Sequence, residues 1–403
     1  MRHARRLRRH PLLRGTALVA VAVVSFAATG AATAYVRLGN NIETHDISSL
    51  VRDIPVPEVT ETPDPTDPNA GRALNILVMG SDSREGEDVV EADQVEGMRS
   101  DTTIVLHISA DRNRMDLVSI PRDSRVQIPS CMYFDGTSSR SQSDRFNAAF
   151  SIGAAHDDVA EAAACTVNTV QSLTGIALDG WVVVDFAGFR NMVDALGGVE
   201  MCIPTEIFSE KASLHLLPGV QRLDGSTALS FARARTGTGL GNGSDIGRLG
   251  RQQQLLGSIA REVFAKNLLT DTPALYRFLT AATQSLKADP DTGNIRNLAG
   301  LSWSLRNIPP ANITFMTIPI ATNPDDPNEV VWTSDAAQIW ANLATDVPMV
   351  PAAPTAPTTP TDTPTDGTAP TTPTTPAVPV EPAVIPTPGL DPFTPADIPA
   401  ICG

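Results

Sequence analysis

All basic residues between positions 222 and 251 are arginines, a composition typical of a phosphate-binding site. This stretch contains two acidic residues, Asp224 and Asp245, and no lysine or glutamate. A solvated helix face would mix Lys and Glu among its arginines, whereas Arg alone is favoured where phosphate oxygens accept two parallel hydrogen bonds. The residues we expect to bind phosphate here, the last two of them on one helix face, are Arg233, Arg235, Arg248 and Gln252.

Two short acidic motifs are candidates for binding a divalent cation. Asp82 follows the apolar run 73–79, and Asp101 lies two residues after Arg99 at the beginning of the next β-rich run. Ligands of open α/β sheets gather at strand ends, and Mg²⁺ is held by one or two carboxylates together with phosphate oxygens. We therefore expect Asp82 and Asp101 to bind Mg²⁺, with Mn²⁺ as an alternative, and Arg99 to contact phosphate. The competing interpretations are a capping turn at Asp82 and a simple ion pair between Arg99 and Asp101.

Two further arginines, Arg122 and Arg145, stand at the boundaries of predicted structural elements. Arg122 comes directly after Pro121, which ends strand pairing and fixes how the next side chain is presented. Arg145 begins the motif Arg-Phe-Asn-Ala-Ala-Phe, whose small residues suit a tightly packed helix start. We expect Arg122 to act in the chemistry and Arg145 to reach the same pocket. A surface turn and simple packing are the respective alternatives.

The composition excludes several classes of protein. The 403 residues carry a net charge of −15, which argues against a nucleic-acid-binding protein because such a protein needs a broad basic face. The chain has no Walker A lysine, no HExxH and no GxSxG. None of the four cysteines has zinc spacing, and in an exported domain they could form disulfides. Cys131–Cys165 is our first choice of pair, because these residues flank the segment 145–155.

The N-terminal segment has the length and composition of a membrane anchor. Residues 15–36 contain no charge and are long enough to cross a hydrocarbon core as a helix. The positive-inside rule places residues 1–14 in the cytoplasm and everything after residue 36 outside the cell. A cleaved signal peptide is the alternative, because Ala32-Thr33-Ala34 resembles a cleavage site. The arginines that precede the apolar run are Arg2, Arg5, Arg6, Arg8, Arg9 and Arg14.

Two proline-bearing segments flank the predicted folded domain. Residues 37–70 are acidic and contain several prolines, which predicts an extended extracellular linker. Residues 348–403 contain Pro/Thr/Ala repeats without Lys or Arg, which predicts a disordered tail. The catalytic domain is then expected at residues 71–347.

Strand and helix patterns alternate within the predicted domain. The β-rich runs are 73–79, 102–109, 115–120 and 181–186, and the helical patterns are 157–173, 186–196, 225–235, 244–264, 273–287 and 295–305. Such alternation predicts an α/β fold, with three α/β/α layers around a central mixed sheet.

Seven motifs in this order make the chain resemble the LytR-CpsA-Psr family of bacterial cell-wall enzymes, in its actinobacterial type. The resemblance covers about residues 75–263, and the motifs are NILVMGSDSR, RSDTTIVLHI, LVSIPRDS, RFNAAF, VVVDFAGFRNMVDALGGVE, LDGSTALSFARAR and SDIGRLGRQQQ. It implies an extracytoplasmic phosphotransferase that moves a glycopolymer from a polyprenyl-pyrophosphate carrier to peptidoglycan, assisted by Mg²⁺. Arg145 stands where the family often has Lys.

The resemblance also assigns roles to individual residues. It implies that Asp82 and Asp101 are associated with the metal, and that pyrophosphate is bound by Arg99, Arg122, Arg233, Arg235 and Arg248, with Gln252 beside them. Two other functions use the same residue types: a non-catalytic polyprenyl-phosphate-binding regulator and a polyprenyl-pyrophosphate hydrolase. The regulator would not need both carboxylates, and the hydrolase would replace the peptidoglycan acceptor with water.

Overall fold

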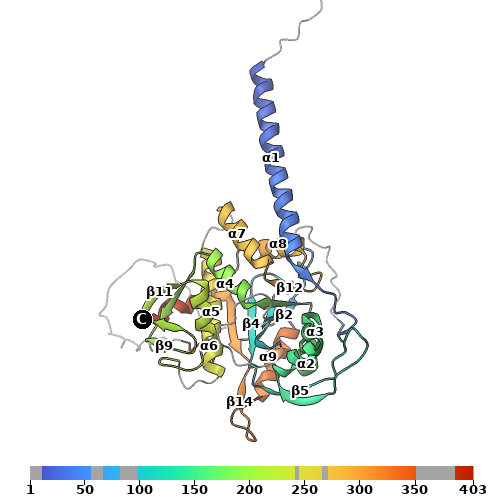
Figure 1. The fold of residues 1–403 in the computed structure, drawn as a ribbon, viewed down its shortest axis with the longest axis vertical. Helices are drawn as coiled ribbons and strands as arrows, with labels where there is room; N and C mark the ends of the chain where they lie inside the picture. The colour runs from blue at the N-terminus through green and yellow to red at the C-terminus, as the bar shows by residue number, and fades with distance from the viewer. Residues whose placement is uncertain are drawn as a thin grey trace, which may run out of the picture.

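The computed structural model describes residues 11–55, 67–81, 98–240, 245–265, 271–350 and 386–402 (Figure 1). Its α-helices are α1 (Pro11–Asn41), α2 (Ala148–Gly153), α3 (Val159–Thr174), α4 (Phe186–Ala195), α5 (Gly225–Arg233), α6 (Asp245–Ala265), α7 (Thr272–Thr283), α8 (Ile295–Leu305) and α9 (Ser334–Ala344). Short 3₁₀ helices are η1 (Ala154–His156), η2 (Pro310–Asn312) and η3 (Pro395–Cys402).

The strands form one large sheet and four two-stranded sheets. The large sheet contains β1 (Glu43–Thr44), β2 (Leu74–Ser81), β3 (Ser100–Ile108), β4 (Met115–Ile120), β7 (Gly180–Asp185), β12 (Leu286–Ala288) and β13 (Ile313–Thr317). The two-stranded sheets pair β5 (Arg125–Ile128) with β6 (Gln142–Arg145), β8 (Val199–Ile203) with β11 (Gly219–Leu223), β9 (Ile207–Ser209) with β10 (Leu214–Leu216), and β14 (Ile320–Thr322) with β15 (Val330–Trp332).

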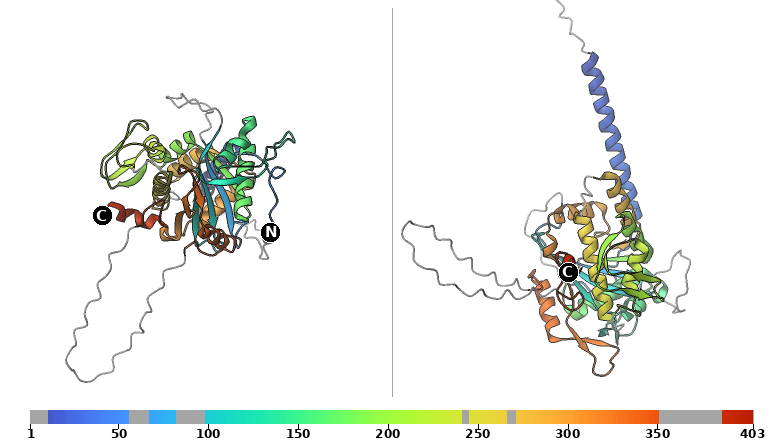
Figure 2. Two further views of the ribbon diagram at one scale, coloured as in Figure 1. Left: turned by 90° about the horizontal axis from the view of Figure 1, so that it is seen from below. Right: turned by 90° about the vertical axis from the view of Figure 1, so that its left-hand side faces the viewer.

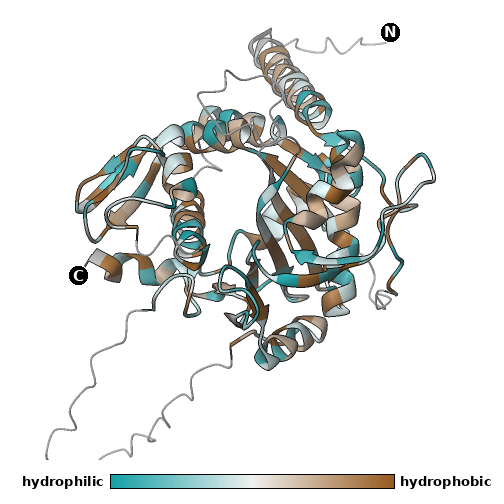
Figure 3. Ribbon diagram, turned by 60° about the horizontal axis from the view of Figure 1, so that its bottom comes forward, coloured by the Kyte–Doolittle hydropathy of each residue, from teal (hydrophilic) through white to brown (hydrophobic). Residues whose placement is uncertain are grey.

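The central sheet has the order β1-β12-β7-β2-β3-β4-β13 and is mixed. β2 is parallel to β7 and antiparallel to β3, while β3 is antiparallel to β4 and β4 is parallel to β13. Its central strands are largely apolar, as the brown colouring of Figure 3 shows, and the neighbours Ile76 and Leu77, which point to opposite faces, are both buried. A sheet that is apolar on both faces must be covered on both.

Helices cover both faces of the sheet, which confirms the predicted three-layer α/β/α fold. On one face, Leu77, Val105 and Val118 of the sheet pack with the apolar side chains of α2, α3 and α9. On the other face, Ile76 and Leu106 pack with α8, and β13 packs against α6. Apolar residues of α4, α5 and α6 form a separate cluster with the two-stranded sheets β8–β11 and β9–β10.

Most predicted elements occur within a few residues of their expected bounds, and two match their ranges fully. β4 and α8 have the bounds that periodicity predicts. The pattern 273–287 is wrong at its end, because α7 stops at Thr283 and the chain enters strand β12. β13 and α9 were not predicted, since segments of five and eleven residues near prolines give a weak periodic pattern.

The structure corrects the predicted linker at residues 37–70. α1 continues to Asn41, and β1 joins the central sheet beside β12. Ile47 and Leu50 are buried in the main core, and Asp67 is buried against Arg112. Residues 37–55 therefore belong to the folded domain, because their spaced apolar residues outweigh the acidic and proline-rich composition. Residues 56–66 lie outside the described part.

The structure also corrects the boundary of the predicted tail. Residues 386–402 fold back onto α6 and β13, where Phe393 and Ile398 are buried and the Phe393 and Phe315 backbones exchange hydrogen bonds of 2.7 and 2.9 Å (Figure 2). The apolar residues of this short stretch distinguish it from the Pro/Thr repeats before it. Of the remaining predicted tail, residues 351–385 lie outside the described part.

A disulfide joins Cys131 to Cys165, as predicted, and fastens the segment after β5 to the middle of α3. Cys202 is also disulfide-bonded. Among the described helices, α1 is the one long and apolar enough to cross a membrane, over the span Leu18–Asn41.

Candidate functional site

The candidate site lies at one edge of the central sheet, where the directions of the strands bring distant segments together. β2, β4 and β7 are mutually aligned, and β3 runs the opposite way. The carboxyl ends of β2, β4 and β7 therefore share an edge with the amino end of β3. Asp101 is the second residue of β3, Arg122 follows β4, and Asp185 ends β7 and caps α4. The register shifts between Gly80 and Ser81, at the point where β2 faces the start of β3.

Asp101 and Arg122 form the centre of this site. The Arg122 Nη1 atom donates a hydrogen bond of 2.6 Å to Asp101 Oδ1. Both side chains are mostly covered, with exposed fractions of 17% for Arg122 and 30% for Asp101. Burial opposes ionisation of Asp101, but the charges of Arg122 and Arg248 outweigh it and lower the pKa of this carboxyl. Asp101 is therefore a carboxylate at neutral pH.

Two of the predicted phosphate-binding arginines reach the same carboxylate. Arg235, which follows α5, places Nη2 3.7 Å from Asp101 Oδ2, and Arg248 on α6 places Nη1 3.9 Å from Asp101 Oδ1. Arg248 also donates a hydrogen bond of 3.3 Å to the Asp101 carbonyl oxygen. Its side chain is only 2% exposed, whereas that of Arg235 is 42% exposed. Arg248 is thus a fixed structural cation, and Arg235 is the most exposed of the three arginines around Asp101.

Two carboxylates that the sequence analysis did not assign to the site complete the cluster. Asp245 forms an ion pair with Arg248 and lies 3.4 Å from Arg122 Nε. Asp123 Oδ2 lies 3.5 Å from the same nitrogen. Burial raises the pKa of the Asp245 carboxyl, although Arg248 and Arg122 oppose the shift. Asp245 was given no role at the site from the sequence, although its i, i+3 spacing to Arg248 was a usable sign of pairing.

Asp245 also offers an oxygen that no described residue satisfies. Its Oδ2 atom is buried and, within the part of the chain that the structure describes, accepts no hydrogen bond. A buried carboxylate oxygen without a donor is costly unless a donor or a cation occupies the adjacent space. This atom therefore fits a cation bound beside Asp101.

Of the two residues predicted to bind the metal, Asp101 lies within the described part of the chain and Asp82 lies outside it. The described segments contain no group of three or more His, Cys, Asp or Glu side chains arranged to hold a metal ion. Mg²⁺ often takes only one or two protein carboxylates and completes its shell with phosphate oxygens and water. Asp101 and the unsatisfied oxygen of Asp245 are compatible with that kind of site.

Arg145 and Arg99 lie in a neighbouring part of the surface. Arg145 Nη1 is 3.3 Å from Asp123 Oδ1, so it joins the cluster through Asp123 and not through Asp101. Its Nε atom is also 3.4 Å from Glu329. A pocket of about 350 Å³ separates Arg145 from Arg99, and its other lining residues are Asp144, Asn147, Ala148 and Ser151. Arg99 is exposed, and within the described chain the cations that pair with Asp101 are Arg122, Arg235 and Arg248.

The structure also places Arg233 outside the Asp101 cluster. Its guanidinium carbon lies 4.5 Å above the ring of Phe186, at the end of β7. Its side chain is exposed, whereas Ala232 and Ala234 on either side are buried. Arg233 therefore borders the site at the adjacent strand end, held by a cation–π contact.

Gln252 and Arg251 have structural contacts next to the cluster. Gln252 Nε2 donates a hydrogen bond of 3.4 Å to the Ala232 carbonyl, and its Oε1 is buried without a described partner. Arg251 donates to the carbonyls of Ala234 and Leu240, and so fixes the loop that carries Arg235. Burial and the nearby charge of Arg248 lower the Arg251 pKa to about 10. Gln252 thus has a free acceptor at the site, while Arg251 positions the loop.

Comparison with known proteins decides the family. The family model described as the LytR_cpsA_psr family matches residues 35–346. The chain belongs to the LytR-CpsA-Psr family. The match begins within α1 and extends through α9, which agrees with the inclusion of residues 37–55 in the folded domain.

Individual members of the LytR-CpsA-Psr family are similar over much of the chain. The cell wall biosynthesis protein LcpA of Corynebacterium glutamicum is 29% identical over 292 residues, covering 68% of this chain and 55% of that protein. The probable cell wall biosynthesis protein LcpB of the same organism is 29% identical over 272 residues, covering 66% and 59%. The match therefore spans less than two thirds of the length of these relatives.

Two further comparisons concern a named transferase and a solved fold. The polyisoprenyl-teichoic acid–peptidoglycan teichoic acid transferase TagV of Bacillus subtilis is 34% identical over 167 residues, covering 40% of this chain and 38% of that protein. A LytR-Csp2A-Psr enzyme from Actinomyces oris has a solved structure that superposes with a TM-score of 0.50 and 20% identity, covering 73% of this chain and 95% of that one. The latter likeness establishes the shared fold.

Proposed function

We propose that this protein is an extracytoplasmic phosphotransferase that moves a glycopolymer from a polyprenyl-pyrophosphate carrier to peptidoglycan through a phosphodiester bond. The observation that carries the proposal is the approach of Arg122, Arg235 and Arg248 to one carboxylate, Asp101, at 2.6, 3.7 and 3.9 Å. Relatives named as polyisoprenyl-teichoic acid–peptidoglycan teichoic acid transferases support the same classes of donor and acceptor.

The arginine cluster has the charge that phosphoryl transfer requires. Such reactions depend mainly on positioning and on neutralising charge at the phosphate oxygens and the leaving group. Arg122 and Arg248 are held in place by Asp101, Asp123 and Asp245, so little reorganisation is needed when a ligand binds. The more exposed Arg235 binds the pyrophosphate first, and Arg233 and Arg145 extend the positive edge on either side.

The proposed reaction breaks one phosphorus–oxygen bond and forms another. An acceptor hydroxyl of peptidoglycan attacks the phosphorus attached to the glycopolymer. The bond from that phosphorus to the bridging oxygen breaks, and polyprenyl phosphate leaves with the electron pair, stabilised by the arginines. The hydroxyl proton passes to the carboxylate of Asp101, whose lowered pKa keeps it ionised, and then to water.

A magnesium ion is part of the proposal. Asp101 would hold it, with Asp82 as predicted and the buried Oδ2 of Asp245 nearby. The ion supplies positive charge to the pyrophosphate oxygens, which supplements the arginines. Mn²⁺ is the alternative cation, since it also takes oxygen ligands in this geometry.

The proposed location is the outer face of the cell membrane. α1 is apolar and uncharged over residues 15–36, and Arg2, Arg5, Arg6, Arg8, Arg9 and Arg14 precede that run. Positive residues favour the cytoplasmic side of a membrane helix. We infer that α1 is a single-pass anchor with a cytoplasmic N-terminus, and that the domain faces the peptidoglycan.

The test uses the full chain in phospholipid vesicles with a polyprenyl-pyrophosphate-linked oligosaccharide and a peptidoglycan acceptor. With Mg²⁺ present, the expected product is oligosaccharide joined to peptidoglycan by a phosphodiester, together with one polyprenyl phosphate per transfer. Chelation of the cation by EDTA should stop transfer, and added Mg²⁺ or Mn²⁺ should restore it. Release of polyprenyl phosphate and oligosaccharide phosphate without transfer would assign a hydrolase, and lipid binding without any product would assign a non-catalytic binding protein.

A further inference from the structure

The C-terminal end of helix α1 is fixed to the domain by direct contacts. The Asn41 Nδ2 atom donates a hydrogen bond of 3.1 Å to Thr283 Oγ1 at the end of α7. Two residues later the chain enters β1, which pairs with β12 at the edge of the central sheet. Leu38 and Ile42 on either side of this junction are buried. The direction of α1 is therefore fixed relative to α7 and α8, which lie at the end of the domain from which α1 projects (Figure 1).

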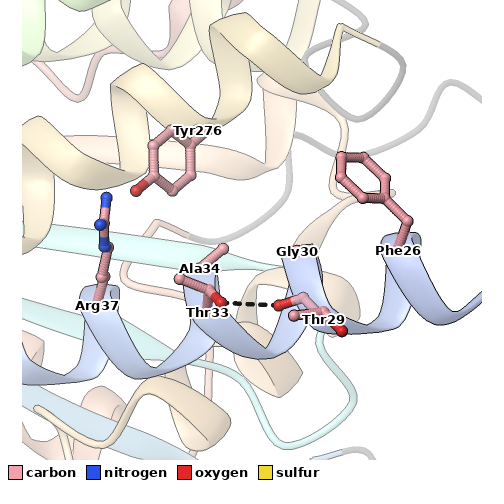
Figure 4. A pocket seen from close by; sticks show the side chains of 7 residues that line it. All are labelled: Phe26, Thr29, Gly30, Thr33, Ala34, Arg37 and Tyr276. Atoms are coloured by element: carbon pink, nitrogen blue, oxygen red, sulfur yellow. Dashed lines mark hydrogen bonds between the residues drawn. The ribbon is translucent and has the colours of Figure 1, made fainter.

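α7 lies beside the outer half of α1. A cavity of about 400 Å³ separates the two helices, and it is lined by Tyr276 from α7 and by Phe26, Thr29, Gly30, Thr33, Ala34 and Arg37 from α1. Figure 4 shows Tyr276 facing α1 with its hydroxyl on the side of Arg37. The cavity thus has an apolar end near Phe26 and a polar end near Arg37.

The position of this cavity relative to a bilayer follows from the charge pattern of α1. The uncharged run covers residues 15–36. As a helix it is about 33 Å long, which matches the hydrocarbon core of a bilayer. Arg37 is the first charged residue after the run and therefore marks the outer interface. Tyr276, across from this end of α1, lies at the level where membrane proteins concentrate Tyr and Trp.

A second aromatic residue points to the same conclusion. Trp303 on α8 is 53% exposed, whereas Trp181 and Trp340 are 2% and 3% exposed. The guanidinium of Arg306 lies 3.9 Å from the centre of the Trp303 ring. An exposed tryptophan with a stacked arginine suits a lipid interface, where the ring meets acyl chains and the cation meets phosphate.

We propose that the face formed by α7 and α8 is a membrane-contact surface, which binds phospholipids of the outer leaflet through Tyr276, Trp303, Arg37 and Arg306. The proposal rests on the inference that α1 crosses the membrane. Outer-leaflet lipids are the occupant because six of the seven lining residues of the cavity belong to α1. The domain is then held with one fixed end against the bilayer.

Tryptophan quenching by lipid tests this surface in the full chain. The protein is placed in phosphatidylcholine vesicles whose acyl chains carry bromine close to the headgroup, because bromine quenches tryptophan on contact. The chain has four tryptophans. We expect brominated lipid to quench the intact protein, and Trp303→Phe to reduce the quenched fraction roughly twofold or more, as for an interfacial tryptophan. Trp332→Phe is the matched control, because Trp332 donates to Ser124 Oγ near the β5–β6 hairpin and should not contact lipid.

The outcomes separate this surface from the anchor. Equal quenching of the intact protein and Trp303→Phe would overturn the contact surface. Resistance to alkaline extraction reports insertion of α1 separately, so a protein that is inserted but shows no Trp303 quenching refutes only the surface. A protein that is extracted by alkali refutes both inferences. Shielding of Trp303 that depends on protein concentration and not on lipid would show a second copy on this face and would also overturn the proposal.

Discussion

The guanidinium of Arg122 lies directly opposite the carboxylate of Asp101 because the register of β3 and β4 continues past the last paired residues. Thr103 pairs with Ile120 in this antiparallel ladder. Two residues further along, the same register places Asp101 opposite Arg122, and their side chains meet at 2.6 Å. The ion pair is thus positioned by the sheet itself.

Replacement of Arg122 by lysine should greatly impair transfer while the protein remains folded. Lysine keeps the charge but cannot span Asp101, Asp123 and Asp245 with one planar group. Loss of one such preorganised donor lowers kcat on the order of 10²-fold in other enzymes, and we expect a similar loss here. The vesicle transfer assay measures it.

Arg222→Lys is the matched control for this substitution. Arg222 pairs with Glu262 at 2.7 Å on β11, and its side chain is 45% exposed. This ion pair lies outside the cluster around Asp101, and lysine keeps its positive charge. Transfer should therefore be unchanged. An Arg122→Lys protein with full activity would contradict the assigned site.

The sequence predicted the layers of this fold better than it predicted its edges. The long apolar runs of β2, β3 and β4 and the periodic helices α3, α6 and α8 are defined by local pattern. β12 could not be predicted in this way, because three residues have no measurable period and their pairing with β7 depends on distant parts of the chain.

The site was predictable by residue type but not by contact. Arg235 and Arg248 were chosen because clustered arginines bind phosphate, and Arg122 because it directly follows Pro121 after a strand. All three meet at Asp101. Arg233 was chosen for the same reason as Arg235, yet it stacks on Phe186: it is the last residue of α5, whereas Arg235 lies beyond the end of that helix. Asp245 was given no role at the site, since pairing through a buried arginine depends on how α6 docks against the sheet.

Removal of the Cys131–Cys165 disulfide should lower stability by about 3–4 kcal/mol, from the loop entropy of a crosslink over this separation. The bond closes a loop with a sequence separation of 34 residues. Cys131→Ser with Cys165→Ser tests this by urea unfolding. Both side chains are fully buried, so Cys131→Ala with Cys165→Ala is the control that separates loss of the crosslink from burial of a hydroxyl. Equal stability of the wild type and the alanine pair would contradict the prediction.

Asp116 should make stability increase as the pH falls below neutral. Burial raises its pKa to about 6, against the opposing charge of Arg114. The folded state therefore binds this proton more tightly than the unfolded state, so the stabilisation is present at low pH and is lost as the pH rises through about 6.

Asp116→Asn isolates this contribution, because asparagine does not titrate. The free energy of unfolding of the variant, relative to that of the wild type, should be highest at pH 7. It should fall by roughly 3 kcal/mol by pH 4 for a pKa shift of this size. The free energy of unfolding, measured from pH 4 to pH 7 for both proteins, checks it. A difference that does not vary with pH would refute the prediction. The paired comparison also cancels the shared response of the buried His107 nearby, whose pKa burial lowers.

The C-terminal segment should stabilise the helix that carries Arg248, and Gly389 is the residue that tests this. Its backbone has φ +91°, and a Cβ atom there would lie 2.8 Å from both the Gly250 nitrogen and the Ile246 carbonyl oxygen of α6. The Gly389 nitrogen also donates a 2.9 Å hydrogen bond to Gln253, whose amide contacts Ser119 and Thr317. Gly389→Ala should therefore displace residues 386–402 from α6.

Two separate effects would act in Gly389→Ala, and a second glycine separates them. Gly136 has a similar φ of +83°, but a Cβ atom there has open space around it. Gly136→Ala should cost about 1 kcal/mol from backbone strain alone, whereas Gly389→Ala should cost at least about 2 kcal/mol because the contact with α6 adds to the strain. If the two substitutions lower the unfolding free energy equally, the contact between residues 386–402 and α6 contributes nothing to stability. If Gly389→Ala also lowers transfer when the protein is still folded, the segment positions Arg248 as well.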